Sequence, residues 1–120
     1  MKAEAVLESA VIAKKAVDAA LDKQASDILM LDIGQLSSFA DYFVICSADS
    51  TRQIHAICDE IDEVLGKEGV KLYRREGEDD SGWVLLDFGP VIVHVFATPQ
   101  REYYEIEKLW SKAAPVVSIL

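Results

Sequence analysis

Several features are scarce in this 120-residue chain, and each scarcity excludes a class of protein. It has only two cysteines, too few for a disulfide scaffold or a zinc site. Its six glycines form no phosphate-binding glycine loop. No apolar run approaches the roughly 18 residues that a membrane span needs, and the charged N-terminus is unlike a signal peptide. We therefore expect a cytoplasmic protein in which Cys46 and Cys58 are buried apolar residues.

Basic residues are also scarce, since 12 Lys and Arg face 21 Asp and Glu, which gives a net charge of -9. An acidic surface repels phosphate, so a broad basic face for nucleic acid and docking on an anionic membrane are both disfavoured. Residues 59–80 alone hold nine acidic and four basic side chains, a local charge of -5. This segment is either a solvated helix face with an acidic loop, or an electrostatic guide toward a basic partner.

Hydrophobic residues, by contrast, are plentiful at 51%, enough for one two-layer core. The length favours a single domain over residues 1–120. Periodicity predicts the order helix, two strands, helix, three strands, helix. The predicted elements are a helix over residues 3–21, strands over 27–33 and 41–46, a helix capped by Asp49 or Ser50 and closed by Gly66 and Gly69, strands over 70–73, 83–87 and 91–96, and a helix from Pro99 whose apolar face is Tyr103, Ile106, Leu109 and Trp110. The tail, residues 113–120, is not assigned. The fold class is α/β, with a mixed sheet of about five strands flanked by helices.

The predicted hairpin of residues 83–87 and 91–96 has two different faces. One is wholly apolar and belongs to the core: Val84, Leu86, Val93 and Val95. If the loop holds an even number of residues, the other face carries three cross-strand pairs: Trp83–Phe96, Leu85–His94 and Asp87–Ile92. An odd loop would change the register. Aromatic residues mixed with an acid and an imidazole are typical of a partner-binding surface.

Each polar residue of this face also has a simpler interpretation. Asp87 is equally well explained as an acid that closes a strand-end turn. His94, taken alone, is more typical of a hydrogen-bonded, half-buried residue than of a metal ligand or a base.

Residues that would carry catalysis are few and scattered. His55 and His94 lack the spacing of metal ligands, and neither cysteine has a base beside it. Asp32 and Asp41 would form a carboxylate pair at neighbouring strand ends, as in phosphoryl-transfer enzymes, although a polar strand end explains each equally well.

An ordered set of motifs over about residues 5–112 resembles the ribosomal silencing factor family, also called Iojap-like or RsfS. The set is DYFVIC at 41–46, STRQI at 50–54, EG at 76–77, WVLLDFG at 83–89, VIVHVF at 91–96, Arg101, and YEIEKLW at 104–110. No single motif is diagnostic, but their order and spacing are specific.

The resemblance implies a nucleotidyltransferase-like fold without nucleotide chemistry, no cofactor and no metal. It implies binding to the large ribosomal subunit through large-subunit ribosomal protein fourteen, on the face that meets the small subunit, so that subunit joining is blocked and translation is repressed. It also implies a homodimer when free. Together with the hairpin face, it predicts these partner-binding residues: Trp83, Leu85, Asp87, His94, Phe96, Arg101 and Tyr104.

Two alternatives remain open at this point. One is a small metal-dependent nucleotidyltransferase or phosphohydrolase that uses Asp32, Asp41 or Asp87 with a divalent cation, which requires two or three carboxylates to converge. The other is a dimeric scaffold whose hairpin face is only its self-interface.

Overall fold

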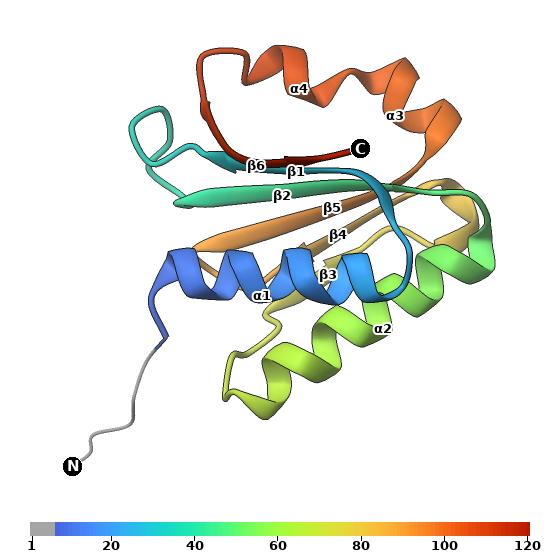
Figure 1. Ribbon diagram of the computed structural model, residues 1–120, viewed down its shortest axis with the longest axis horizontal. Coiled ribbons are helices and arrows are strands. Elements are labelled where there is room, and N and C mark those ends of the chain that lie inside the picture. The colour runs from blue at the N-terminus through green and yellow to red at the C-terminus, as the bar shows by residue number, and fades with distance from the viewer. Residues whose placement is uncertain (1–6) are drawn as a thin grey trace.

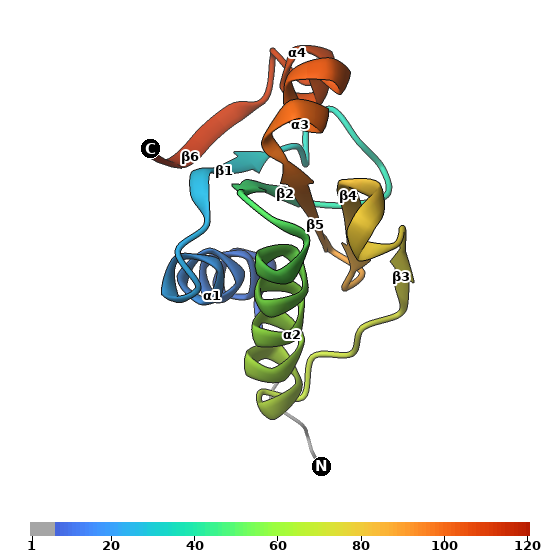
Figure 2. The same ribbon diagram turned by 90° about the vertical axis from the view of Figure 1, so that its right-hand side faces the viewer.

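A six-stranded sheet lies between two layers of helices in the computed structural model, which describes residues 7–120 (Figure 1). Helices α1 and α2 cover one face of the sheet, and the short helices α3 and α4 lie over the middle of the other face (Figures 1 and 2). The elements are α1 (Ser9–Asp22), β1 (Ser26–Asp32), β2 (Tyr42–Ala48), α2 (Thr51–Lys67), β3 (Arg74–Glu76), the 3-10 helix η1 (Asp79–Ser81), β4 (Trp83–Asp87), β5 (Val91–Ala97), α3 (Thr98–Tyr104), α4 (Ile106–Leu109) and β6 (Ala114–Ile119).

The sheet is mixed, as predicted, with the strand order β3-β4-β5-β2-β1-β6. Within residues 7–120 only the central strands β2 and β5 are parallel, because the crossover through α2 returns the chain in the same direction. All other neighbours are antiparallel. The number of strands is six rather than about five, since the unassigned tail forms β6 beside β1.

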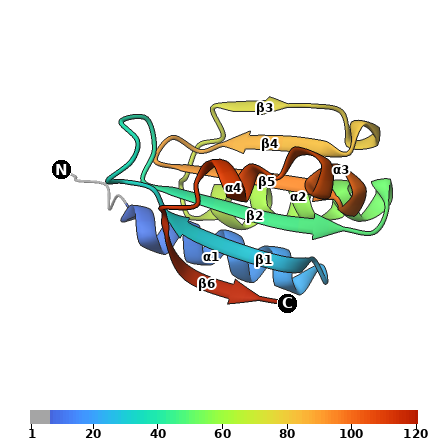
Figure 3. The same ribbon diagram turned by 90° about the horizontal axis from the view of Figure 1, so that it is seen from above.

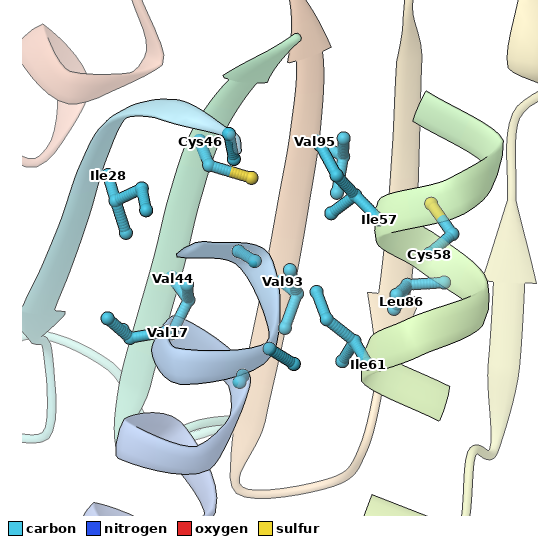
Figure 4. Packing of buried hydrophobic residues seen from close by; sticks show 14 of the residues in the cluster. Val17, Ile28, Val44, Cys46, Ile57, Cys58, Ile61, Leu86, Val93 and Val95 are labelled. Carbon is cyan, nitrogen blue, oxygen red and sulfur yellow. The ribbon is translucent and has the colours of Figure 1, made fainter. Parts of the chain in front are cut away.

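The main core lies between the sheet and the pair α1 and α2 (Figure 4). The apolar stripe of α2 is buried as its periodicity predicts: Ile54, Ile57, Cys58, Ile61 and Leu65. Helix α1 contributes mostly alanines, whose small side chains let it approach the sheet closely: Ala13, Ala16, Ala19 and Ala20. Both cysteines lie in this core, as predicted.

The start of α2 is fixed by the predicted pair Ser50 and Gln53. The Gln53 amide donates a hydrogen bond to Ser50 Oγ at 3.1 Å, which satisfies one free donor of the first turn. The Gln53 side chain accepts from the Asp49 amide at 2.6 Å rather than from that of Ser50. Its Nε2 also donates to the carbonyls of Lys23 and Gln24, so this cap joins α2 to the end of α1.

Two predicted boundaries are wrong. Helix α1 begins at Ser9, with Glu8 as its N-cap, while residues 3–6 of the predicted helix lie outside the described residues. The predicted strand over residues 70–73 is instead β3, at Arg74–Glu76. The shift follows from pairing, because Arg74 and Glu76 are the residues that lie opposite Asp87 and Leu85 of β4.

The predicted final helix is broken into two. Glu105 adopts a left-handed backbone with φ of 50°, which ends α3 and redirects the chain into α4. The predicted apolar face is divided accordingly. Ile106 is buried and Trp110 is partly buried, but Tyr103 and Leu109 are exposed.

Candidate partner-binding surface

The β4–β5 hairpin has the predicted register. Trp83 lies opposite Phe96, Leu85 opposite His94, and Asp87 opposite Ile92, with the four residues 88–91 between the last pair. These six residues form what we call the hairpin face. The residues of the opposite face are completely buried in the main core, as predicted: Val84, Leu86, Val93 and Val95.

The residues of the hairpin face differ in exposure between its two strands. Trp83, Leu85 and Asp87 of β4 are partly exposed, because neither α3 nor α4 covers β4 (Figure 3). His94 and Phe96 of β5 are 3% and 0% exposed, since β5 lies beneath α3. In this structure His94 and Phe96 therefore support the surface from below and do not form part of its exposed area.

Aromatic rings connect the exposed and the buried residues of this face. The Trp83 ring stacks on Phe96 with centroids 4.9 Å apart and also contacts Tyr104 of α3 at 4.7 Å. Tyr104 is 48% exposed, so it extends the open surface beside Trp83. The exposed surface formed by Trp83, Leu85, Asp87 and Tyr104 is called the Trp83 surface below.

The aromatic cluster continues to residues that the sequence patterns did not connect with the hairpin. The ring centroid of Phe43 in β2 lies 4.7 Å from that of His94 and 5.0 Å from that of Trp110. The ring centroids of Phe39 and Trp110 are 6.2 Å apart. The parallel β2–β5 pair brings Phe43 beside this cluster, and that pairing could not be read from local periodicity.

His94 orients the Trp83 ring. The indole Nε1 of Trp83 donates a hydrogen bond to His94 Nδ1 at 3.2 Å, and since indole is only a donor, the imidazole proton is on Nε2. That Nε2 is buried and has no hydrogen-bond partner within residues 7–120. Burial lowers the pKa of His94 to about 4, so the ring is neutral at pH 7. The simpler interpretation of His94 as a hydrogen-bonded residue is confirmed, but the residue is completely rather than half buried.

Asp87 combines two roles. Its Oδ1 accepts a hydrogen bond from the Gly89 amide at 2.8 Å, which closes the hairpin turn as the simpler interpretation expects. Its Oδ2 lies 3.9 Å from an Arg74 nitrogen, a long contact, and about a quarter of the side chain remains exposed. One carboxylate edge is therefore still available to a cation on a partner.

Arg101 is not part of the Trp83 surface, and its side chain is mostly buried, with 11% exposed. Its guanidinium donates to the Asp27 carbonyl, to Ser47 Oγ at 2.9 Å and to Glu107 Oε2 at 3.0 Å. These hydrogen bonds join α3 to the beginning of β1, to β2 and to α4. Arg101 therefore holds the helices that carry Tyr104, and direct contact of Arg101 with a partner is not supported.

The carboxylates of the enzyme alternative have separate structural roles. Asp32 accepts from the Gly34 amide at 3.0 Å, and Asp41 accepts from Ser9 Oγ at 2.6 Å. Within residues 7–120 no three His, Cys, Asp or Glu side chains lie close enough together to hold a metal ion. Burial raises the pKa of both cysteine thiols to about 12, so they remain protonated and are poor nucleophiles. In the same part of the chain, none of the helices is both long enough and apolar enough to cross a membrane.

Comparison with known proteins decides the family. A family model described as "Ribosomal silencing factor during starvation" matches residues 6–119. The chain belongs to this ribosomal silencing factor family. A relative from Bacillus subtilis (strain 168), named ribosomal silencing factor RsfS, is 46% identical over 102 residues, which cover 85% of this chain and 86% of that protein.

Two further similar proteins extend the comparison. A crystal structure of a Chromobacterium violaceum protein has a TM-score of 0.85 and 35% identity, and it covers 92% of this chain and 94% of that chain. A mouse protein named "Mitochondrial assembly of ribosomal large subunit protein 1" is 33% identical over 100 residues, 74% of this chain and 40% of the mouse protein. The silencing-factor resemblance drawn from the sequence motifs is thus confirmed, together with the α/β fold.

Proposed function

We propose that this chain represses translation by binding large-subunit ribosomal protein fourteen on the intersubunit face of the large ribosomal subunit, where it sterically blocks the small subunit. Membership in the silencing factor family supports the ribosome as the target. The name of the mouse relative supports the large subunit. The observation that carries the proposal is the Trp83 surface: an exposed aromatic and acidic patch on a rigid support.

Trp83 has the properties of a binding anchor. Its ring packs against both Phe96 and Tyr104, and its indole N–H donates to His94, so little side-chain freedom remains to be lost on binding. Tryptophan is also among the residues that contribute most to interface energies. Asp87, at the other end of the same strand beyond Leu85, would accept charge-assisted hydrogen bonds from Arg or Lys of a basic ribosomal protein.

A steric mechanism requires bulk and rigidity rather than a reactive group. Even the shortest dimension of the domain is 23 Å, far more than the separation of two surfaces in contact. A domain of that thickness bound at the intersubunit face would prevent the subunits from meeting there. We propose accordingly that the protein acts in the cytoplasm as a binding protein and not as an enzyme, and that it is a homodimer when free.

The test is co-sedimentation of purified variants with large ribosomal subunits. We expect Trp83→Ala and Asp87→Arg each to abolish co-sedimentation while the circular dichroism spectrum and the urea midpoint show that the fold survives. Asp62→Arg is the matched control, since it makes the same charge change on α2, on the opposite side of the sheet, and should bind like the unmodified protein. Binding by both Trp83→Ala and Asp87→Arg at the unmodified level would refute the proposal.

The dimeric-scaffold alternative is separated in the same experiment. If the Trp83 surface is only a self-interface, Trp83→Ala will convert a dimer into a monomer in analytical ultracentrifugation without any loss of ribosome binding. Loss of ribosome binding by a variant that keeps its oligomeric state assigns the surface to the ribosome.

A further inference from the structure

A second concave surface lies on the other side of the α3–α4 helices. These helices run along the middle of the upper face of the sheet, with β4 and the Trp83 surface on one side and β1 and β6 on the other (Figure 3). On the β1–β6 side there is a groove of about 600 Å³. It is lined on one side by β1, β2, β6 and the last residue of the chain, and on the other by α3, α4 and Glu105 between them.

We infer that this groove binds a basic, extended protein segment that carries an aliphatic side chain between its cationic residues. The inference concerns a contact separate from the Trp83 surface and does not rest on the proposed function. A volume of about 600 Å³ is within the range of 300–1,000 Å³ that is usual for specific ligand sites, and it would hold a few residues of a peptide.

The groove is formed in advance by Arg101. The guanidinium lies in the groove wall and ties Asp27 and Ser47 on the strand side to Glu107 on the helix side. The two sides therefore keep their separation without a ligand, and a ligand would not have to order them on binding. Because Arg101 already donates to three groups, it has little capacity left to bind a phosphate or a carboxylate.

The side chains at the rim of the groove carry a net negative charge, which favours a cationic ligand. Arg101 is neutralised by Glu107 at 3.0 Å, and Lys108 is neutralised by Glu105 at 2.9 Å. Two acidic side chains of the rim, Asp27 and Glu102, form no ion pair within residues 7–120. Four acids against two bases leave the groove with a charge of -2.

The floor selects an aliphatic group. Leu29 is partly exposed on the groove side of the sheet and Leu120 is 97% exposed, whereas Ile28 and Ile119 pack toward the main core on the other face. Covering Leu29 and Leu120 with an apolar group would remove their surface from water, at about 25 cal/mol per Å². An acidic rim over an apolar floor therefore fits alternating basic and aliphatic residues, whereas nucleic acid and acidic peptides would be repelled.

The experiment titrates the isotopically labelled full chain with the peptide Lys-Leu-Lys-Leu-Lys and, separately, with Glu-Leu-Glu-Leu-Glu, by calorimetry and by amide NMR. We expect saturable binding of the basic peptide only, with the largest amide shifts at Ser47, Thr98 and Ser118. Glu102→Lys should weaken this binding about tenfold, because it replaces an attraction by a repulsion. Asp62→Lys, with the same change of net charge on α2, should weaken it less than twofold. Leu120→Ser, at an exposed position, tests the apolar contact and should weaken binding without unfolding the protein.

Several results would overturn the inference. They are the absence of saturable binding up to millimolar peptide, binding of the acidic peptide, equal weakening by Glu102→Lys and Asp62→Lys, and amide shifts centred on Trp83 instead of the groove. Failure of any kind here would leave the co-sedimentation test of the Trp83 surface unaffected, since that test uses different residues and a different partner.

Discussion

Acid should destabilise this protein through His94. The imidazole is 3% exposed among Phe43, Trp83 and Phe96, and burial lowers its pKa from 6.5 to about 4. No carboxylate compensates for a proton there, since the one hydrogen bond of the ring is accepted from Trp83 and its Nε2 has no partner within residues 7–120. A charge at this position would therefore be both desolvated and unpaired.

The sign and size of the effect follow from the two pKa values. Above pH 6.5 the histidine is neutral in both the folded and the unfolded chain, so it makes no pH-dependent contribution. As the pH falls from 6.5 to 4, the unfolded chain takes up the proton and the folded chain does not, so the free energy of unfolding falls by about 1.4 kcal/mol per pH unit. The total loss is about 3 kcal/mol, a large part of the stability of a typical domain. Below pH 4 the contribution of His94 no longer changes.

Urea unfolding of the unmodified chain and of His94→Asn, measured from pH 7.5 to 4, isolates this contribution. Asparagine places an oxygen near the position of Nδ1 and so can still accept the Trp83 N–H, but it does not titrate. All carboxylates are common to both proteins, so their effects cancel in the difference. We expect His94→Asn to be the less stable protein at pH 7.5, because it loses ring packing, and this deficit to shrink by about 3 kcal/mol by pH 4. Two parallel stability curves would refute the reasoning.

Three other predictions concern stability and reactivity. Arg101→Met should reduce the free energy of unfolding by about 3 kcal/mol in urea, because Glu107 would lose its cation and Ser47 its donor; a loss below about 1 kcal/mol would contradict this role. Gly77→Ala should destabilise the fold, because the φ of Gly77 is +94° and an added Cβ would overlap the Trp83 carbonyl oxygen. Gly66→Ala in α2, where an added Cβ meets no other atom within 4 Å, should instead stabilise the fold by about 0.5–1 kcal/mol. Equal effects of the two alanines in thermal melts would be inconsistent with this geometry. Cys46 and Cys58 should react with a thiol reagent only as fast as the domain opens, because both thiols are buried with pKa values of about 12; rapid labelling of the folded protein at pH 8 would show otherwise.

Local sequence patterns were enough to predict the elements whose packing partners are close in sequence. The register of the β4–β5 hairpin follows from strand alternation and a short loop, and the burial of α2 follows from its helical period. The strand predicted over residues 70–73 failed for the opposite reason. Val70 and Leu72 have the alternation of a strand, but they pack against the core from a loop, while the charged Arg74–Glu76 pairs with β4. Which of two adjacent segments pairs is a property of the partner strand.

The residues that share the candidate site could be predicted from the sequence, but which of them are exposed could not. Strand alternation correctly placed Trp83, His94 and Phe96 on one face. It could not show that α3 would cover β5 and leave β4 open, because that depends on where the chain turns after Ala97 and again at Glu105. The burial of Arg101 was hidden for the same reason, since its partners Asp27 and Ser47 are 74 and 54 residues away in sequence.

The helices α3 and α4 give the two surfaces of the upper face a common support. Tyr104 stands on the side of Trp83, and Glu102, two residues earlier on the same helix, lines the groove. Both positions depend on the bonds from Arg101 to Ser47 and Glu107 and on the burial of Ile106, since the two helices are too short to be stable by themselves. The Arg101–Glu107 pair is partly buried, with 11% and 34% of the two side chains exposed, and an ion pair withdrawn from water is a poor source of net stability because its desolvation cost offsets its attraction. Its directional hydrogen bonds, however, fix a short helix at one position on a flat sheet, which apolar contacts alone do not specify. The placement of Arg101 is therefore better explained by the geometry that it imposes on the two surfaces than by the stability that it contributes.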